Sequence, residues 1–150
     1  MSGGRDGPDE PVVSGLAAEP VGPYPHARRV GDLLFLSGIG PRERGAAAIP
    51  GVTQDATGAV TARDFEVQAR ATFANVRAVM DAAGAAWDDI VDVTVFLTHM
   101  DDDFGALNRI WADEFPDEAT RPCRTTVEVN RLPTPIDIEL KVIACTKPSR

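Results

Sequence analysis

The sequence predicts an α+β domain in which two helices cover one face of a sheet of about six strands. Residues 61–84 and 101–115 repeat apolar side chains every three or four positions, as amphipathic helices do. The remaining apolar segments are short or alternate with polar residues, which is typical of strands. In chain order the pattern is β-β-α-β-α-β-β.

The chain is expected to form one domain, because 150 residues are enough to bury a core. Residues 1–20 are rich in Gly, Pro, Asp and Glu, so we expect a flexible N-terminal tail followed by a single domain over residues 21–150. The N-terminus lacks the apolar segment of a signal peptide, and no long apolar run follows. This favours a cytoplasmic protein without a membrane span.

Charge and composition argue against several classes of function. The net charge of −8 disfavours a nucleic-acid or anionic-membrane partner, since both attract basic surfaces. His26 and His99 are isolated, and there is no metal-ligand spacing or glycine-rich phosphate loop, so neither a metal nor a cofactor is expected. Cys123 and Cys145 are too few for a disulfide framework, although a single bridge is conceivable and their redox state stays open.

Two short strands open the domain. Residues 26–38 (HARRVGDLLFLSG) place Gly31-Asp32, a hairpin turn signal, between two strand-forming runs. Residues 41–61 contain turn residues throughout, and we interpret them as a long loop with room for a short strand. Whether residues 42–61 act as a lid stays open.

The first helix is predicted within residues 61–84. Thr61 is a plausible N-cap with Asp64 three residues further on, and Gly84 fits the position after the helix. The apolar face of this helix consists of Phe65, Ala69, Phe73, Val76, Met80 and Ala83.

A strand and the second helix follow. Residues 89–100 (DIVDVTVFLTHM) alternate apolar and polar side chains, which predicts a strand with one buried face. Residues 101–115 form a helix that Pro116 ends, with aspartates at its N-terminus that suit the helix dipole. The buried face of the strand consists of Val91, Val93, Val95 and Leu97. The apolar face of the helix consists of Phe104, Leu107, Trp111 and Phe115.

The chain is predicted to close with a β-hairpin formed by Cys123–Val129 and Ile136–Cys145. On its second strand, alternate residues from Ile138 to Ala144 are apolar, whereas Glu139 lies on the other face. Both helices cover the same face of the sheet, and no third helix is available for the opposite face. A partly apolar, uncovered face predicts a homo-oligomer.

Arg124 and Glu139 are the leading candidates for chemistry, because charged residues in strands that otherwise form a core need a reason. A guanidinium offers a planar fork that binds a carboxylate, and a glutamate beside a substrate moves protons or orients water. The alternative is a structural ion pair at the edge of the sheet.

Five further residues accompany this pair. Tyr24 lies between prolines that fix its backbone, so its ring either lines a pocket or packs on the surface. Ser37 offers a hydroxyl or a backbone amide but has no catalytic partner. Asn108 either hydrogen-bonds a ligand or loop or is exposed, and Thr126 shares the face of Arg124. His26 has no visible partner in the sequence, and an isolated histidine is usually structural, although a role in binding substrate is the alternative.

Four motifs resemble the reactive intermediate deaminase (RidA) family. They are GPYPHA, LLFLSG, DIVDVTVFLTHMDDDFGALNRIWADEF and PCRTTVEVNRLP…IELKVIA, and together they run from Val21 to Ala144. The resemblance implies a chorismate-mutase-like fold and a homotrimer with a central barrel and clefts between subunits. It also implies cofactor-independent hydrolysis of enamines or imines to a carbonyl compound and ammonia.

Matched motif by motif, Arg124 takes the place of the family's substrate-carboxylate arginine and Glu139 that of its acidic residue. Tyr24, Ser37 and Asn108 fall on positions that line the cleft. Two departures stand out: Ile39 replaces a common glutamine, and Thr126 stands where a cysteine is frequent. The substrate implied is a small enamine or imine that carries a carboxylate.

The segments YPHARRVGDLLFLSGIGPR and IPGV look like the 2-aminomuconate deaminase branch, which acts in the degradation of aromatic compounds. That substrate is a dicarboxylate, so a second cation should face the cleft, with His26, Arg28 and Arg131 as candidates. The alternatives are general clearance of 2-aminoacrylate-type imines and a non-catalytic ligand-binding trimer.

Overall fold

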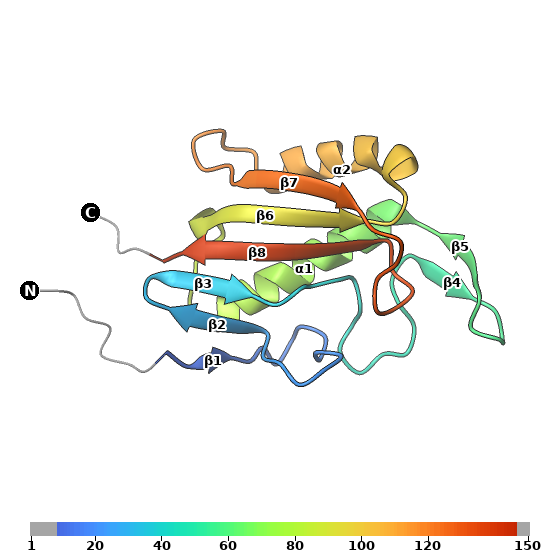
Figure 1. Ribbon diagram of the computed structural model, residues 1–150, viewed down its shortest axis with the longest axis horizontal. Helices are drawn as coiled ribbons and strands as arrows, with labels where there is room; N and C mark the ends of the chain where they lie inside the picture. The colour runs from blue at the N-terminus through green and yellow to red at the C-terminus, as the bar shows by residue number, and fades with distance from the viewer. Residues whose placement is uncertain (1–8, 147–150) are drawn as a thin grey trace, which may run out of the picture.

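The computed structural model describes residues 9–146, in which two helices lie on one face of a mixed six-stranded sheet (Figure 1). This confirms the predicted α+β class. The helices are α1 (Phe65–Ala82) and α2 (Met100–Glu114). In spatial order, the strands are β1 (Pro11–Val12), β2 (Ala27–Val30), β3 (Leu33–Leu36), β8 (Ile138–Cys145), β6 (Ile90–Leu97) and β7 (Cys123–Glu128).

The core lies between the sheet and the two helices. Phe73 and Leu107 bring the helices against Val95 and Leu140 of the central strands, and all four side chains are buried. The predicted apolar faces of the helices therefore do form the core, except for Phe104, which is 41% exposed. None of the helices within residues 9–146 combines the length and apolar character needed to cross a bilayer.

Two local predictions need correction. The N-cap of α1 is Asp64, whose side chain accepts from the Val67 amide at 3.1 Å; Thr61 instead belongs to strand β5 (Val60–Arg63). Val91 is 44% exposed rather than buried, because a register irregularity between Ile90 and Asp92 reverses the alternation there.

The hairpin at Gly31-Asp32 is confirmed, since Val30 pairs with Leu33 and Gly31 adopts a φ of 65°. The loop at residues 41–61 contains β4 (Val52–Gln54), which pairs with β5 as a separate two-stranded sheet at one end of the molecule (Figure 1).

The predicted closing hairpin is wrong. Strand β7 pairs in parallel with β6, and β8 pairs with β3 and β6, so β6 lies between the two strands (Figure 1). The reason is that β6, α2 and β7 form a β-α-β crossover, which returns a strand parallel to the first. Cys123 and Cys145 are consequently two strands apart, and both are free thiols.

The N-terminal segment, expected to be a flexible tail, contributes to the fold from residue 9 onward. Strand β1 pairs with β2, Ala17 forms a bridge with Glu43, and Ser14 is almost fully buried. Residues 1–8 lie outside the described residues.

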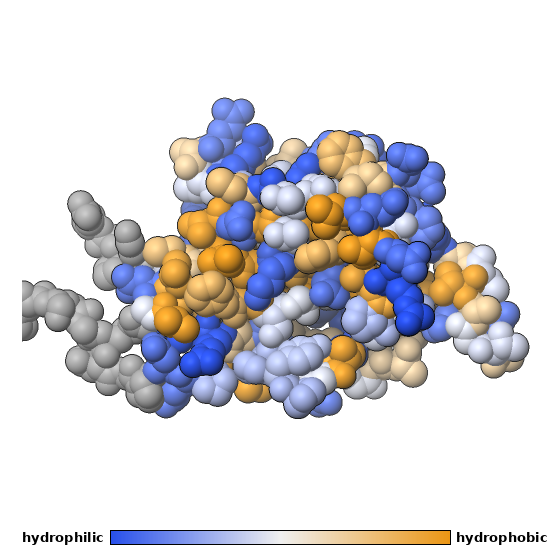
Figure 2. Space-filling model, in the orientation of Figure 1, coloured by the Kyte–Doolittle hydropathy of each residue, from blue (hydrophilic) through white to orange (hydrophobic). Residues whose placement is uncertain are grey.

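The sheet face opposite the helices carries apolar side chains, as Figure 2 shows from that side. Hydrophobic residues gather on this face over β3, β6 and β8, and several of them are partly exposed. Those on this face are Val30, Leu33, Phe35, Phe96, Val127 and Ile143.

A buried polar cluster joins β5 to the sheet and the helices. Arg63 contacts both Asp103 and Asp137, with its Nε 2.9 Å from the Asp137 carboxylate. Gln68 donates to the same carboxylate at 2.6 Å and accepts from the Asp137 amide at 2.8 Å. Burial alone would raise the pKa of Asp137, but hydrogen bonds from Arg63, Gln68 and Thr98 lower it below its ordinary value.

We expect Arg63→Met to destabilise the protein by about 2–4 kcal/mol, because it leaves two carboxylates without their shared cation in a largely buried place. Arg70→Met is the matched control, since Arg70 pairs with Glu66 and Asp113 at the exposed surface. Denaturant unfolding measures both. Equal, small effects would show that the cluster does not hold this end of the fold together.

Candidate active site in two halves

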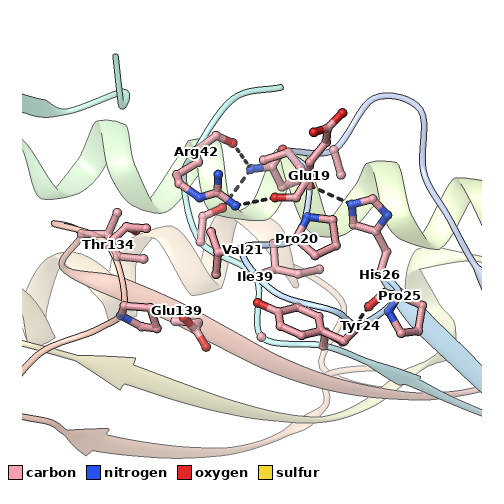
Figure 3. A pocket seen from close by; sticks show the side chains of 18 residues that line it. Glu19, Pro20, Val21, Tyr24, Pro25, His26, Ile39, Arg42, Thr134 and Glu139 are labelled. Atoms are coloured by element: carbon pink, nitrogen blue, oxygen red, sulfur yellow. Dashed lines mark hydrogen bonds between the residues drawn. The ribbon is translucent and has the colours of Figure 1, made fainter. Parts of the chain in front are cut away.

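A cavity of about 360 Å³ lies where the N-terminal segment crosses the end of β3 (Figure 3). Its walls come from residues 17–26, from residues 37–42, from the 133–136 loop and from Glu139. Asn75 of α1 lines it as well. The cavity size falls in the lower range of small-molecule sites, ~300–1,000 Å³.

Four predicted residues line this cavity: Tyr24, His26, Ser37 and Glu139. The Ser37 hydroxyl donates to the Pro25 carbonyl at 2.8 Å, which leaves its oxygen lone pairs available. The backbone beside Glu139 is fixed by two hydrogen bonds. The Leu140 amide donates to the Ile39 carbonyl at 2.8 Å, and the Ile39 amide donates to the Leu140 carbonyl at 2.9 Å. Burial raises the pKa of Glu139, so its carboxyl takes up a proton more readily than an ordinary glutamate.

Gly38 packs directly against the Glu139 side chain. A Cβ built on Gly38 would lie 2.8 Å from the Glu139 Cδ and closer still to one carboxylate oxygen. Only a residue without a side chain lets the carboxylate occupy this place.

Arg124, Asn108 and Thr126 form a second group, on the helix side of the sheet. An Arg124 Nη donates to the Asn108 Oδ1 at 2.7 Å, and the guanidinium lies over the Trp111 ring at 5.0 Å. Burial lowers the pKa of Arg124, and no carboxylate within the described residues forms an ion pair with it. A half-buried cation paired with an amide and an aromatic ring is suited to receive an anion.

The two groups lie on opposite faces of the same sheet. Glu139 pairs with Phe96 and Arg124 with Val93, three residues away on β6. Because side chains alternate along a strand, this odd spacing sends Glu139 to the open face and Arg124 toward α2. The internal ion pair considered as the alternative is therefore absent from the described chain.

His26 lines the cavity but has no ring nitrogen left for a ligand. Its Nδ1 accepts from the Ser14 amide at 3.0 Å, and its Nε2 donates to the Ala18 carbonyl at 2.7 Å. The ring is 5% exposed and holds the N-terminal segment in place. These contacts agree with the structural role that an isolated histidine usually has, and the substrate contact also considered from the sequence stays a prediction.

The other expected cations lie elsewhere. Arg28 is exposed on β2, and Arg131 faces a separate hollow near His99 and Asp137. Arg42 lines the cavity instead. No pattern in the sequence indicated Arg42, because it lies in an aperiodic loop whose course the sequence does not predict.

Solved structures share this arrangement of sheet and helices. The crystal structure of Escherichia coli TdcF with bound serine is 31% identical, covers 91% of this chain and 98% of its own, and superposes with a TM-score of 0.77. The E. coli YjgF gene product, at 30% identity, covers 92% and 99% with the same TM-score of 0.77. The fold is thus that of the Rid-type proteins.

Sequence comparison shows the family. A model described as Endoribonuclease L-PSP matches residues 15–146, and the chain belongs to that family. "RutC family protein slr0709" of Synechocystis sp. is 38% identical over 133 residues, 89% of this chain and 93% of that protein. "Putative reactive intermediate deaminase TdcF" of E. coli strain K12 is 36% identical over 125 residues, 83% and 87% respectively. The family resemblance expected from the motifs is confirmed.

We expect Gly38→Ala to fold and to displace the Glu139 carboxylate into another rotamer, since the added methyl group takes its place. Gly105→Ala is the control, because the nearest atom to its new Cβ is the flexible end of Arg109 at 3.9 Å. Crystal structures of both variants measure the displacement. An unmoved carboxylate in Gly38→Ala would show that the backbone yields instead.

Proposed function

We propose that the protein is a cofactor-independent deaminase that hydrolyses an enamine or imine acid to a carbonyl compound and ammonia. The observation that carries this proposal is a half-buried arginine without a carboxylate partner, together with a glutamate of raised pKa in a cavity. Membership of a family that includes reactive intermediate deaminases supports deamination in general.

The active site in this proposal forms between two copies of the chain. Arg124 and Glu139 face away from each other within one chain, so only a neighbouring copy brings an Arg124 to the cavity. The apolar open face of the sheet offers the contact surface (Figure 2). In a homotrimer, the open faces of the three sheets would turn toward a central barrel. Its closed symmetry would cover the apolar face of each chain and give each cavity an Arg124 from a neighbouring copy.

Arg124 of one subunit binds the substrate carboxylate through its planar fork, while Asn108 fixes the direction of that fork. Thr126, half-buried on the same face, contributes a hydroxyl. This anchor places the nitrogen-bearing carbon beside Glu139 of the neighbouring subunit. Tyr24 and Ser37 form the wall next to it.

An enamine first tautomerises to the imine, whose carbon is electrophilic. Glu139 accepts a proton from water as the water oxygen attacks that carbon, which gives a tetrahedral carbinolamine. Glu139 returns this proton to the former imine nitrogen. It then takes up the hydroxyl proton of the carbinolamine and passes it to the same nitrogen, so that the carbon–nitrogen bond breaks and ammonia leaves as the carbonyl forms. A raised pKa suits a group that takes up and returns a proton in each of these two steps.

Within this class, 2-aminomuconate is the substrate we propose, from the sequence segments shared with that deaminase branch. The alternative is general clearance of 2-aminoacrylate-type imines, which the similarity to TdcF favours. The family description also names an endoribonuclease, but a net charge of −8 is unsuited to binding a phosphate backbone.

Arg124→Met is expected to lower kcat/KM about 10²–10³-fold, the scale of losing one preorganised charged contact at a reacting centre. Arg124→Lys keeps the charge but loses the fork and should recover little. Arg109→Met, on the exposed surface of α2, is the charge-matched control. Ammonia release from imines generated in situ measures all three. Activity near that of the original protein in a folded Arg124→Met assembly would contradict the proposal.

A further inference from the structure

Arg42 brings a second guanidinium to the cavity that holds Glu139. Figure 3 shows Arg42 on one side of the cavity and Glu139 with Tyr24 on the other, with Val21 and Ile39 between them. Arg42 is half-buried. The chemical step of the proposed hydrolysis uses Arg124 and Glu139 and does not itself require this cation.

The position of Arg42 is fixed at both ends. Its own carbonyl accepts from the Asn75 amide at 2.7 Å, and the same amide group donates to Gly40 at 2.8 Å, which ties the loop to α1. Its guanidinium donates to the Glu19 carbonyl at 2.5 Å. The Glu19 segment is in turn held by His26 through Ala18.

The charge of Arg42 is not neutralised within the described residues. Its guanidinium contacts a neutral carbonyl, and no carboxylate there forms an ion pair with it. Arg44, two residues further on, lies 3.6 Å from the Glu19 carboxylate and does not line the cavity. A positioned cation with free donors, facing a cavity, is an anion site.

We propose that Arg42 binds a second carboxylate at the far end of the substrate, so that the site selects dicarboxylate enamines or imines. This inference rests on the proposed deaminase function and adds the residue that determines specificity. One carboxylate lies on Arg124 of the neighbouring subunit and the other on Arg42. Glu139 faces the carbon–nitrogen bond between them. Two guanidinium groups balance two substrate charges in a chain whose net charge of −8 otherwise repels a dianion.

The imines of glutamate and glutamine provide the test, because they have nearly the same size and differ in the distal charge. Amino-acid oxidases generate both in situ, and ammonia release above the spontaneous rate gives kcat/KM. We expect the unchanged protein to prefer the glutamate imine. Arg42→Met should lower kcat/KM for that imine about 10–100-fold, as expected for one charge-assisted contact, and change the glutamine imine little.

Arg44→Met is the control, with the same loss of charge in the same loop, and should leave the preference intact. Arg42→Lys keeps the charge and should keep part of the preference, which guards against a folding defect in Arg42→Met. Equal rates on the two imines by the unchanged protein, or an equal loss on both in Arg42→Met, would overturn the inference while leaving the deaminase function in place. Hydrolysis of neither imine would contradict the deaminase function itself, and this inference with it.

Discussion

Strand β6 lies between β7 and β8, and its pairing with both determines where the candidate site residues point. Because the pleat alternates side chains, the register across these three strands sends Arg124 to the helix face and Glu139 to the open face. In the proposed function, one chain therefore carries two incomplete half-sites, with Arg124 as the anion-binding group of one and Glu139 as the proton-accepting group of the other. The proposed catalysis then depends on assembly, since a chain alone cannot bring these two groups to the same substrate.

Two buried polar contacts shape the half-site that contains Glu139. His26 holds the N-terminal segment over the cavity through Ser14 and Ala18. Asp137, the anchor of the buried polar cluster, fixes the end of the 133–136 loop, which forms another wall. Neither group is placed to act on a substrate. Both hold backbone segments in position. The loops that line the cavity lack regular backbone hydrogen bonding, and these side-chain contacts stabilise them instead.

Much of the fold was predictable because local periodicity decides it. The apolar faces of α1 and α2 and the alternation of β8 were read correctly, and Arg124 and Glu139 stood out as charges in strands. The predicted closing hairpin was wrong because adjacency in sequence does not determine pairing when a crossover places a strand between. Arg42 and the docking of residues 9–20 were missed because both depend on long-range contacts of aperiodic segments. No periodic signal in the sequence marks such contacts.

Complementation between two inactive variants tests whether Arg124 and Glu139 of different subunits serve one active site. Arg124→Met and Glu139→Gln damage different half-sites, so each alone should be nearly inactive. Co-expressed with two different affinity tags and purified through both, mixed assemblies should recover activity, with roughly one site in three intact in each mixed trimer of a closed ring. Mixed assemblies that contain both chains and remain as inactive as the single variants would show that Arg124 and Glu139 do not serve one site across two subunits.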